Sequence, residues 1–225
     1  MINNNAAVLF DLDGVLIDSP DAHARSWVEV FSPFGINLPL RRLHLDEGRQ
    51  SIEIAQRICT EYNLDFDAVT LNQMIRKKRE IYRKNAPHGM LPAARFAVEG
   101  VKASGWLVGM VTGSVEKNVL TALNADEIQL FDTVIKAGDY KQGKPDPEPF
   151  LVACRNLDTA PEHCIVVENA PLGITAAKSA GMRVIAITST LTRDELKHAD
   201  YIVDDLSTLP ALIGNASSVE NIRFN

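Results

Sequence analysis

The sequence predicts an α/β protein with a Rossmann-like parallel sheet core and an inserted α-helical cap. From residue 92 onward, apolar runs of strand length alternate with helical patterns, which is typical of parallel strands joined by helical crossovers. Residues 20–89 show helical periodicity and no convincing strand. The apolar run at residues 6–10 can join the sheet only if these helices are an insertion. We therefore predict a core of residues 1–18 and 90–225 and a cap of residues 19–89.

Composition limits the possible functions. The chain has 225 residues, 46% of them hydrophobic, which is enough for a sizeable core. Its net charge of -6 provides no basic excess for nucleic acid, so we expect no such partner. The apolar runs are too short to span a membrane, and the first five residues lack a signal-peptide pattern. Cys59, Cys154 and Cys164 lack C-x-x-C spacing and are predicted to be reduced thiols of a cytoplasmic protein.

The first predicted strand, residues 6–10, leads directly into Asp11, Asp13 and Gly14. Open α/β sheets place their ligand sites at the carboxyl ends of their strands. Two acids this close repel each other unless a cation or a substrate proton lies between them. The pair therefore suits a nucleophile, an acid/base group and a divalent metal. A loop whose aspartates only cap backbone amides would leave the same pattern.

The inserted segment carries helical periodicity throughout. Apolar residues recur at helical spacing, for example at Ile52, Ala55 and Cys59. A turn at residues 85–89 returns the chain to the sheet. The predicted helices of the cap cover residues 20–34, 46–62 and 65–84.

The rest of the core is assigned from the alternation of short apolar runs with longer amphipathic stretches. Because each strand is followed by a helix, the strands are expected to be parallel. The predicted strands are residues 106–111, 133–136, 164–167, 184–187 and 201–203, and the predicted helices are residues 93–102, 116–123, 147–156, 172–180 and 193–198.

Polar residues also follow later strands. Thr112, Gly113 and Ser114 place hydroxyl groups and free backbone amides between a strand and a helix, which suits a phosphate but also an ordinary helix cap. Lys144 stands just before a helix start, where its ammonium group could hold a phosphate or a carboxylate.

Glu168 and Asn169 end another buried strand and could bring oxygen ligands to Mg²⁺, although an ordinary polar turn would look the same. All these strand ends belong to one parallel sheet, so their side chains can converge in one crevice. Together they provide the parts of a metal-assisted phosphoryl-transfer site.

The same stretches resemble the four motifs of the haloacid dehalogenase superfamily, in their order and spacing and over essentially the whole chain. The resemblance is strongest to the branch that contains β-phosphoglucomutase and small sugar-phosphate phosphatases. The motifs that carry it are Asp11-Leu-Asp13-Gly14, Thr112-Gly113-Ser114, Lys144-Pro-Asp-Pro and Val-Val-Glu168-Asn169.

The resemblance implies a role for each matching residue. Asp11 would be the nucleophile that forms an aspartyl-phosphate. Asp13 would protonate the leaving group and then activate water or a second substrate; its presence argues against dehalogenation. Thr112 and Lys144 would hold the transferring phosphoryl group, and Lys144 would also neutralise Asp11.

The resemblance also implies Mg²⁺ as cofactor, bound by Asp11, Asp13, Glu168 and Asn169. The family usually has aspartate at the position of Asn169. An amide oxygen can still ligate Mg²⁺ but brings no charge. We therefore expect weaker metal binding, or a more direct part for Glu168.

Three residues of the cap are further candidates for substrate binding. His23, four residues before Trp27, matches a histidine that reaches the site from the cap in the same branch, and Lys78 resembles a cap lysine. Arg49 could bind a distal phosphate bidentately. For Lys78 and Arg49, a solvated helix face is the alternative interpretation. The predicted substrate-binding residues are Gly14, His23, Arg49, Lys78, Gly113 and Ser114.

We therefore expect a Mg²⁺-dependent enzyme that transfers phosphoryl groups through an aspartyl-phosphate, and we favour a phosphatase of small phosphorylated sugars. β-Phosphoglucomutase is the alternative, because the motifs do not decide whether water or a sugar hydroxyl accepts the phosphoryl group. A weakly catalytic protein that binds a phosphorylated ligand is a third hypothesis, with Asn169 as its symptom. The expected partner is a small phosphorylated metabolite, and the expected state is a cytoplasmic monomer.

Overall fold

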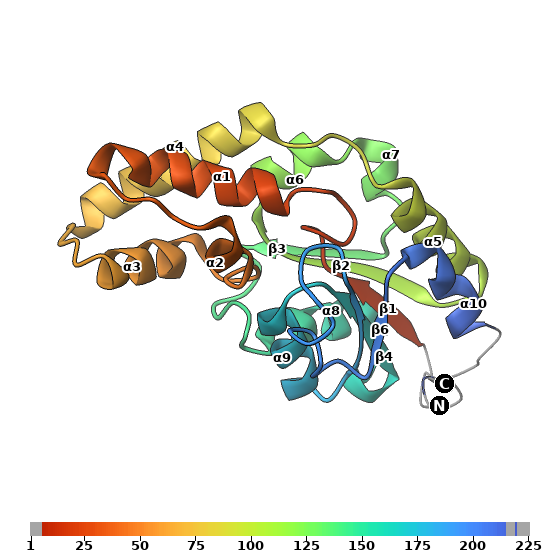
Figure 1. The fold of residues 1–225 in the computed structure, drawn as a ribbon. Helices are drawn as coiled ribbons and strands as arrows, with labels where there is room; N and C mark the ends of the chain where they lie inside the picture. Colours follow the sequence, from red (N-terminus) through yellow and green to blue (C-terminus); the bar gives the residue numbers. More distant parts are fainter. Residues whose placement is uncertain (1–5, 215–218, 220–225) are drawn as a thin grey trace.

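The computed structural model describes residues 6–214 and 219 (Figure 1). The outer limits of the predicted core, residues 1 and 225, lie outside these ranges, as do the five N-terminal residues that lack a signal-peptide pattern. Within the described residues, no helix combines the length and apolar character needed to cross a membrane.

The core is one parallel sheet with the strand order β3-β2-β1-β4-β5-β6, which confirms the predicted Rossmann-like class. The central strand, β1, pairs with β2 and β4, so that Phe10 lies opposite both Met110 and Val167. Every residue of β1 is buried because both faces of the sheet are covered. The strands are β1 (Ala7–Phe10), β2 (Leu107–Val115), β3 (Thr133–Ala137), β4 (Cys164–Glu168), β5 (Arg183–Ile187) and β6 (Tyr201–Val203).

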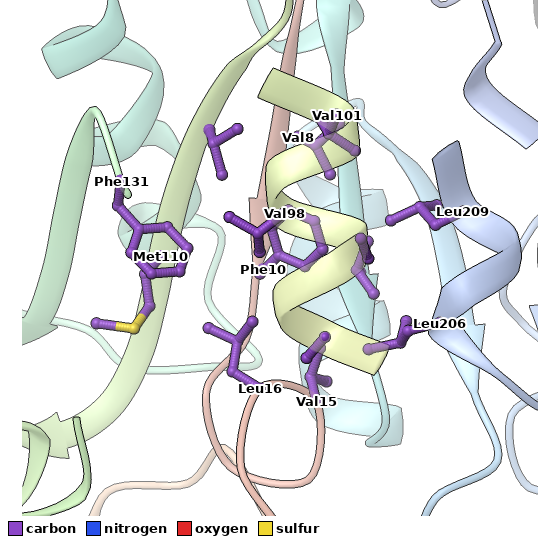
Figure 2. Close-up of a cluster of buried hydrophobic side chains, with 14 of the residues drawn as sticks. Val8, Phe10, Val15, Leu16, Val98, Val101, Met110, Phe131, Leu206 and Leu209 are labelled. Atoms are coloured by element: carbon purple, nitrogen blue, oxygen red, sulfur yellow. The ribbon is translucent and has the colours of Figure 1, made fainter. Parts of the chain in front are cut away.

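One face of the sheet is covered by α5 (Pro92–Ala103) and α10 (Leu209–Ile213) (Figure 1). Figure 2 shows Val98 of α5 over Phe10 of β1, with Leu209 beside them. Val8 and Phe10 of β1 face these helices and alternate with Ala7 and Leu9, which face the opposite side.

The opposite face is covered by α8 (Glu148–Leu157) and α9 (Pro171–Ser179). Phe150 and Ile174 pack there against Leu9 and Val166. With helices on both faces, only the carboxyl ends of the strands remain for a polar site.

The inserted segment consists of helices, as predicted, and contains no strand between residues 20 and 89. Trp27, Ile58 and Met74 belong to a third hydrophobic cluster that holds these helices together. The predicted boundaries at 18/19 and 89/90 stay a prediction; we call Pro20–Asn85 the cap. Its elements are α1 (Pro20–Phe31), η1 (Ser32–Phe34), α2 (Leu40–His44), α3 (Ser51–Glu61) and α4 (Ala68–Asn85).

Several predicted helix limits differ from the structure. The helix predicted at 65–84 begins at Ala68, because the Asp67 side chain accepts a hydrogen bond from the Thr70 amide and caps it. The helix predicted at 46–62 begins only at Ser51. The helix predicted at 20–34 is divided into α1 and the 3₁₀ helix η1, and α6 (Glu116–Ala122) lies where a helix was predicted. The segments not predicted are α2, α10, α7 (Ala125–Ile128) and the 3₁₀ helices η2 (Pro161–His163) and η3 (Leu206–Thr208).

The helix predicted at residues 193–198 is wrong: the structure has a series of turns there. The Glu195 carboxylate accepts hydrogen bonds from the Thr192 amide and hydroxyl, and Arg193 donates to the carbonyl of Ile202. Leu196 is fully buried without a helix around it. These side-chain contacts compete with helical hydrogen bonding, which a segment of six residues supports only weakly.

Candidate active site

Asp11 lies where β1 ends. Its amide donates to the carbonyl of Val167 at 3.0 Å and so continues the sheet by one residue. The carboxylate is nearly buried, and its Oδ1 accepts a hydrogen bond from Lys144 Nζ at 2.6 Å. Within the described residues, Oδ2 has no hydrogen-bond donor, so it is the oxygen available to a ligand.

Lys144 is a buried cation held between two carboxylates. Its ammonium group donates to Asp11 at 2.6 Å, to Glu168 Oε1 at 2.7 Å and to the carbonyl of Val111 at 3.2 Å. Burial opposes its charge, but Asp11 and Glu168 hold the pKa of Lys144 above its ordinary value. Burial raises the pKa of Asp11 to about 7, although Lys144 lowers it.

Glu168, at the end of β4, is fully engaged by donors. Oε1 faces Lys144, and Oε2 accepts from the amides of Asn169 at 2.8 Å and Ala170 at 3.0 Å. Gly173 leaves the space for this carboxylate, since a Cβ there would lie 1.7 Å from Oε1. Glu168 therefore holds both the Lys144 ammonium group and the loop after β4 in place.

Asp13 lies in the turn after β1, which Gly14 makes possible with a φ of 85°. Its Oδ1 accepts from Ser19 Oγ at 2.6 Å and faces His23 Nε2 at 3.0 Å, and its Oδ2 accepts from Ser114 Oγ at 3.0 Å. Burial alone would raise the pKa of Asp13, but the His23 ring and the serine hydroxyls hold it well below its usual range. Asp13 is thus a carboxylate in this arrangement.

His23 and Lys78 form a relay from the cap to Asp13. Lys78 Nζ lies 2.5 Å from His23 Nδ1, while His23 Nε2 faces Asp13, and the ring stacks on Tyr82 with centroids 3.8 Å apart. Burial and the nearby Lys78 lower the pKa of His23. A neutral ring that accepts from Lys78 must donate through Nε2 to Asp13, which fixes its tautomer.

Lys78→Met is expected to stabilise the protein at pH ~6.5 by about 1–4 kcal/mol, because an apolar side chain of similar length replaces a buried ammonium group. Burial lowers the pKa of Lys78 from 10.5 to about 7. Between these values the unfolded chain binds a proton that the folded chain lacks, so the stability of the wild type rises with pH. The advantage of Lys78→Met therefore shrinks towards pH ~9.5, as urea unfolding can measure.

Lys77→Met is the matched control, because Lys77 is the exposed neighbour of Lys78 on α4. Its effect is expected to stay within about 0.5 kcal/mol at both pH values. A difference between Lys78→Met and the wild type that did not change with pH would contradict the buried-ammonium explanation.

The strand end at Thr112–Ser114 meets the cap directly. Thr112 Oγ1 accepts from the Ser114 amide at 2.9 Å and lies 3.5 Å from Asp13 Oδ2. A Cβ at Gly113 would lie 3.4 Å from the carbonyl oxygen of Gly48 in the cap. The core and the cap therefore approach each other closely around the carboxylate of Asp13.

Most of the predicted site residues line one cavity between the sheet and the cap. Three of the twelve do not line it but lie beside it: Gly14 in the turn after β1, Thr112 behind Ser114, and Lys144 behind Asp11. The predicted residues that line the cavity are Asp11, Asp13, His23, Arg49, Lys78, Gly113, Ser114, Glu168 and Asn169.

Arg49 has partners within its own segment. Its guanidinium group donates to Asp46 Oδ1 at 3.2 Å and to Glu53 Oε2 at 3.4 Å. It still lines the cavity, as does Arg79, which the sequence analysis missed. Arg79 follows Lys78 in a basic run, and only the fold distinguishes its inward direction from that of the exposed Lys77.

Glu47 is a further cavity residue that the sequence analysis missed. Its Oε2 accepts a hydrogen bond from Asn169 Nδ2 at 2.8 Å. Burial, opposed by this hydrogen bond and supported by the charges of Asp13, Asp11 and Glu168, raises the pKa of Glu47 to about 9. The sequence held one indirect signal for Glu47. Asparagine at position 169, where the family usually has aspartate, leaves a missing negative charge that another acid could supply, but it does not show where in the chain that acid lies.

The residues of the site fit Mg²⁺ as a set of carboxylate and carboxamide oxygens, and not as a cluster of carboxylates alone. Within the described ranges, no group of three or more His, Cys, Asp or Glu side chains is arranged to hold a metal. The Asn169 carboxamide oxygen, however, is buried and has no hydrogen-bond partner in the part of the chain that the structure describes. Together with Asp11 Oδ2, it offers the oxygen ligands that a hard cation prefers.

Comparisons with known proteins agree with this geometry. A family described as haloacid dehalogenase-like hydrolase matches residues 8–187. The chain is 32% identical to validoxylamine A 7'-phosphate phosphatase of Streptomyces hygroscopicus subsp. limoneus, covering 88% of this chain and 93% of that protein. It is 30% identical to beta-phosphoglucomutase of Bacillus subtilis, covering 80% and 82%. The structure of beta-phosphoglucomutase from Clostridium difficile superposes with a TM-score of 0.80 at 28% identity, over 91% of this chain and 93% of that one.

Proposed function

The chain belongs to the haloacid dehalogenase-like hydrolases and is a phosphatase or phosphomutase; we propose that it is a Mg²⁺-dependent phosphatase of small phosphorylated sugars that works through an aspartyl-phosphate. The observation that carries the proposal is the state of Asp11. One oxygen of this carboxylate is held by the buried Lys144, and the other faces the cavity beside Asp13.

In the first step, Asp11 Oδ2 attacks the phosphorus atom of the sugar phosphate. A bond forms between Oδ2 and phosphorus, the ester bond to the sugar oxygen breaks, and Asp13 gives that oxygen a proton. Asp13 must be protonated for this step; the negative charge of an incoming phosphate monoester favours the protonated form. Lys144 holds Asp11 in place and offsets its charge.

In the second step, Asp13, now a carboxylate again, takes a proton from a water molecule that attacks the phosphorus atom. The bond to Asp11 breaks and inorganic phosphate leaves. The hydrogen bonds from Ser19, His23 and Ser114 support Asp13 as the carboxylate that this step needs.

Mg²⁺, held by Asp11, Asp13 and Asn169, would neutralise the charge of the phosphoryl group. Glu168 supports this set indirectly, because its oxygens already hold Lys144 and the amide of Asn169. Gly113, Ser114, His23, Lys78 and Arg49 surround the space in which the sugar phosphate would lie.

β-Phosphoglucomutase activity is a second candidate because side chains of the cap reach the core site. His23 reaches Asp13 from the cap, and Lys78 lies behind it against Nδ1 of the His23 ring. Arg41 of the cap pairs with Glu195 of the core and donates to the carbonyl of Thr190 at 3.0 Å. Excluding water would favour a sugar hydroxyl as the acceptor of the phosphoryl group.

The test is to incubate the Mg²⁺-loaded protein with β-glucose 1-phosphate and a trace of glucose 1,6-bisphosphate, and to follow the products by phosphorus NMR. Release of inorganic phosphate supports the phosphatase, and a panel of sugar phosphates then identifies the preferred substrate. Formation of glucose 6-phosphate without phosphate release would establish the mutase instead. If neither product forms with any sugar phosphate of the panel, the proposed function is wrong and a phosphorylated-ligand binding protein is left.

A further inference from the structure

The loop between α2 and α3 reaches from the cap into the carboxyl ends of the core strands. A Cβ at Gly48 would lie 3.3 Å from Lys144 Cδ, and Gly48 has a φ of 85° that favours glycine. The preceding residue, Glu47, lines the same cavity as Asp11 and Asp13. This loop therefore brings a carboxyl group of the cap to the core site.

The buried Asp46 anchors the loop within the cap. Its carboxylate accepts from Arg49 Nε at 3.2 Å, lies 3.3 Å from Arg57 Nε and pairs with Arg42. Three arginines around one aspartate fix the backbone next to Glu47. The position of Glu47 is thus set by the cap, while its partner belongs to the core.

Glu47 determines which way the Asn169 carboxamide faces. Asn169 Nδ2 donates to Glu47 Oε2 at 2.8 Å and to Thr190 Oγ1 at 3.2 Å. With both nitrogen protons used on that side, the amide oxygen has to face away from Glu47 Oε2 and Thr190. Asn169 is 1% exposed, so this oxygen cannot simply be solvated by bulk water.

Two buried oxygens in this pair have no hydrogen-bond partner within residues 6–214 and 219: Asn169 Oδ1 and Glu47 Oε1. An acceptor that is buried without a donor or a cation costs about 1–3 kcal/mol. Two such acceptors on bonded side chains, in the cavity that holds Asp11 Oδ2, have the chemistry of a hard divalent cation site.

We propose that Glu47 completes the cation site from the cap. A bound cation favours the ionised form of Glu47 over the protonated form that burial favours. The carboxylate then supplies the negative charge that Asn169 lacks and orients the Asn169 carboxamide so that its oxygen is free for Mg²⁺. The inference rests on the Mg²⁺ dependence of the proposed function. It makes cation binding depend on contact between the cap and the core, because the two halves of the pair come from different segments.

The pair also explains why asparagine is suitable at position 169. Aspartate there would place a second carboxylate at hydrogen-bond distance from Glu47, and like charges this close repel each other. The amide instead donates to Glu47. The negative charge that aspartate at position 169 would supply from the core loop is supplied instead by Glu47 from the cap loop.

The test is calorimetric titration of Mg²⁺ into metal-free protein, a measurement that requires no turnover. Glu47→Gln retains an acceptor for Asn169 but removes the charge, and it is expected to weaken Mg²⁺ binding about tenfold, equivalent to about 1.4 kcal/mol. The double variant Glu47→Gln with Asn169→Asp returns the charge to the core loop and is expected to bind within about threefold of the wild type. Glu80→Gln, at an exposed position of α4, is the control for a lost cap charge and should bind as the wild type does.

The outcomes separate this inference from the proposed function. If Glu47→Gln binds Mg²⁺ as tightly as the wild type, or the double variant binds no better than Glu47→Gln, Glu47 is not part of the site, while a Mg²⁺-dependent phosphatase remains intact. If the wild type binds no Mg²⁺, both the inference and the proposed metal dependence are wrong. Thermal unfolding in EDTA checks that each variant is folded before its titration is interpreted.

Discussion

Asp11→Asn is expected to lower the turnover of a sugar phosphate by at least about 10³-fold, because the amide cannot form the acyl-phosphate bond that the mechanism requires. The amide oxygen can still accept the hydrogen bond from Lys144, so folding should be retained. The measurement is phosphate release under saturating substrate and Mg²⁺, with the melting temperature measured in parallel.

Asp194→Asn is the matched control for Asp11→Asn. Its carboxylate is 87% exposed, and its one ion-pair partner among the described residues is Lys197, three residues away, at 3.5 Å. This variant should turn over substrate at the wild-type rate. If Asp11→Asn retained more than about a tenth of the wild-type turnover, Asp11 could not be the nucleophile.

Lys144→Met is expected to lower the free energy of unfolding by about 3–5 kcal/mol and to abolish turnover, since it leaves two buried carboxylates without their cation. In the wild type, Lys144 lies 2.6 Å from Asp11 and 2.7 Å from Glu168 and is 1% exposed. Methionine preserves the apolar part of the side chain, so a cavity would not explain the loss. Urea unfolding at two pH values measures it.

The pH dependence identifies the cause of that loss. Without Lys144, burial raises the pKa of Asp11 further, so the folded variant binds a proton that the unfolded chain has already released. Its stability therefore falls as the pH rises from ~5 to ~8, and the loss relative to the wild type grows over this range. A loss that did not vary with pH would point to packing and contradict the electrostatic explanation.

Lys178→Met is the control for Lys144→Met, because it removes the same charge from a half-exposed ion pair. Lys178 Nζ lies 2.6 Å from Asp200 Oδ1 at the surface. Solvent screens such a pair, and the expected change is within about 1 kcal/mol. Equal losses for the two variants would mean that burial of the Lys144 site has no energetic consequence.

The local sequence pattern was enough to predict the parallel sheet and the polar residues at the carboxyl ends of its strands. The apolar run before Asp11 and the run before Glu168 can only be buried on both faces, which requires parallel strands covered by helices. Once these strands are parallel, their carboxyl ends share one edge, so the convergence of Asp11, Ser114 and Glu168 follows from topology.

Short segments were beyond this kind of prediction. Residues 193–198 form turns because Arg193 and Glu195 use their side chains in contacts with Ile202 and Thr192, and no local pattern reveals these partners. The helix α7 did have a local signal, a capping box of Asn124 and Glu127, but at four residues it is too short for hydrophobic periodicity to show.

What the sequence by itself determined is the class of the fold and the place of Asp11, Asp13 and Glu168 at the carboxyl ends of buried strands, because each of these depends on residues that are neighbours along the chain. Only the tertiary structure decided that Glu47 meets Asn169 across 122 positions and that Arg49 binds Asp46 and Glu53. The physical reason is that a contact between cap and core depends on how two separately packed surfaces fit together. Hydrophobic periodicity records which side of a helix is buried, but not which polar group it will face.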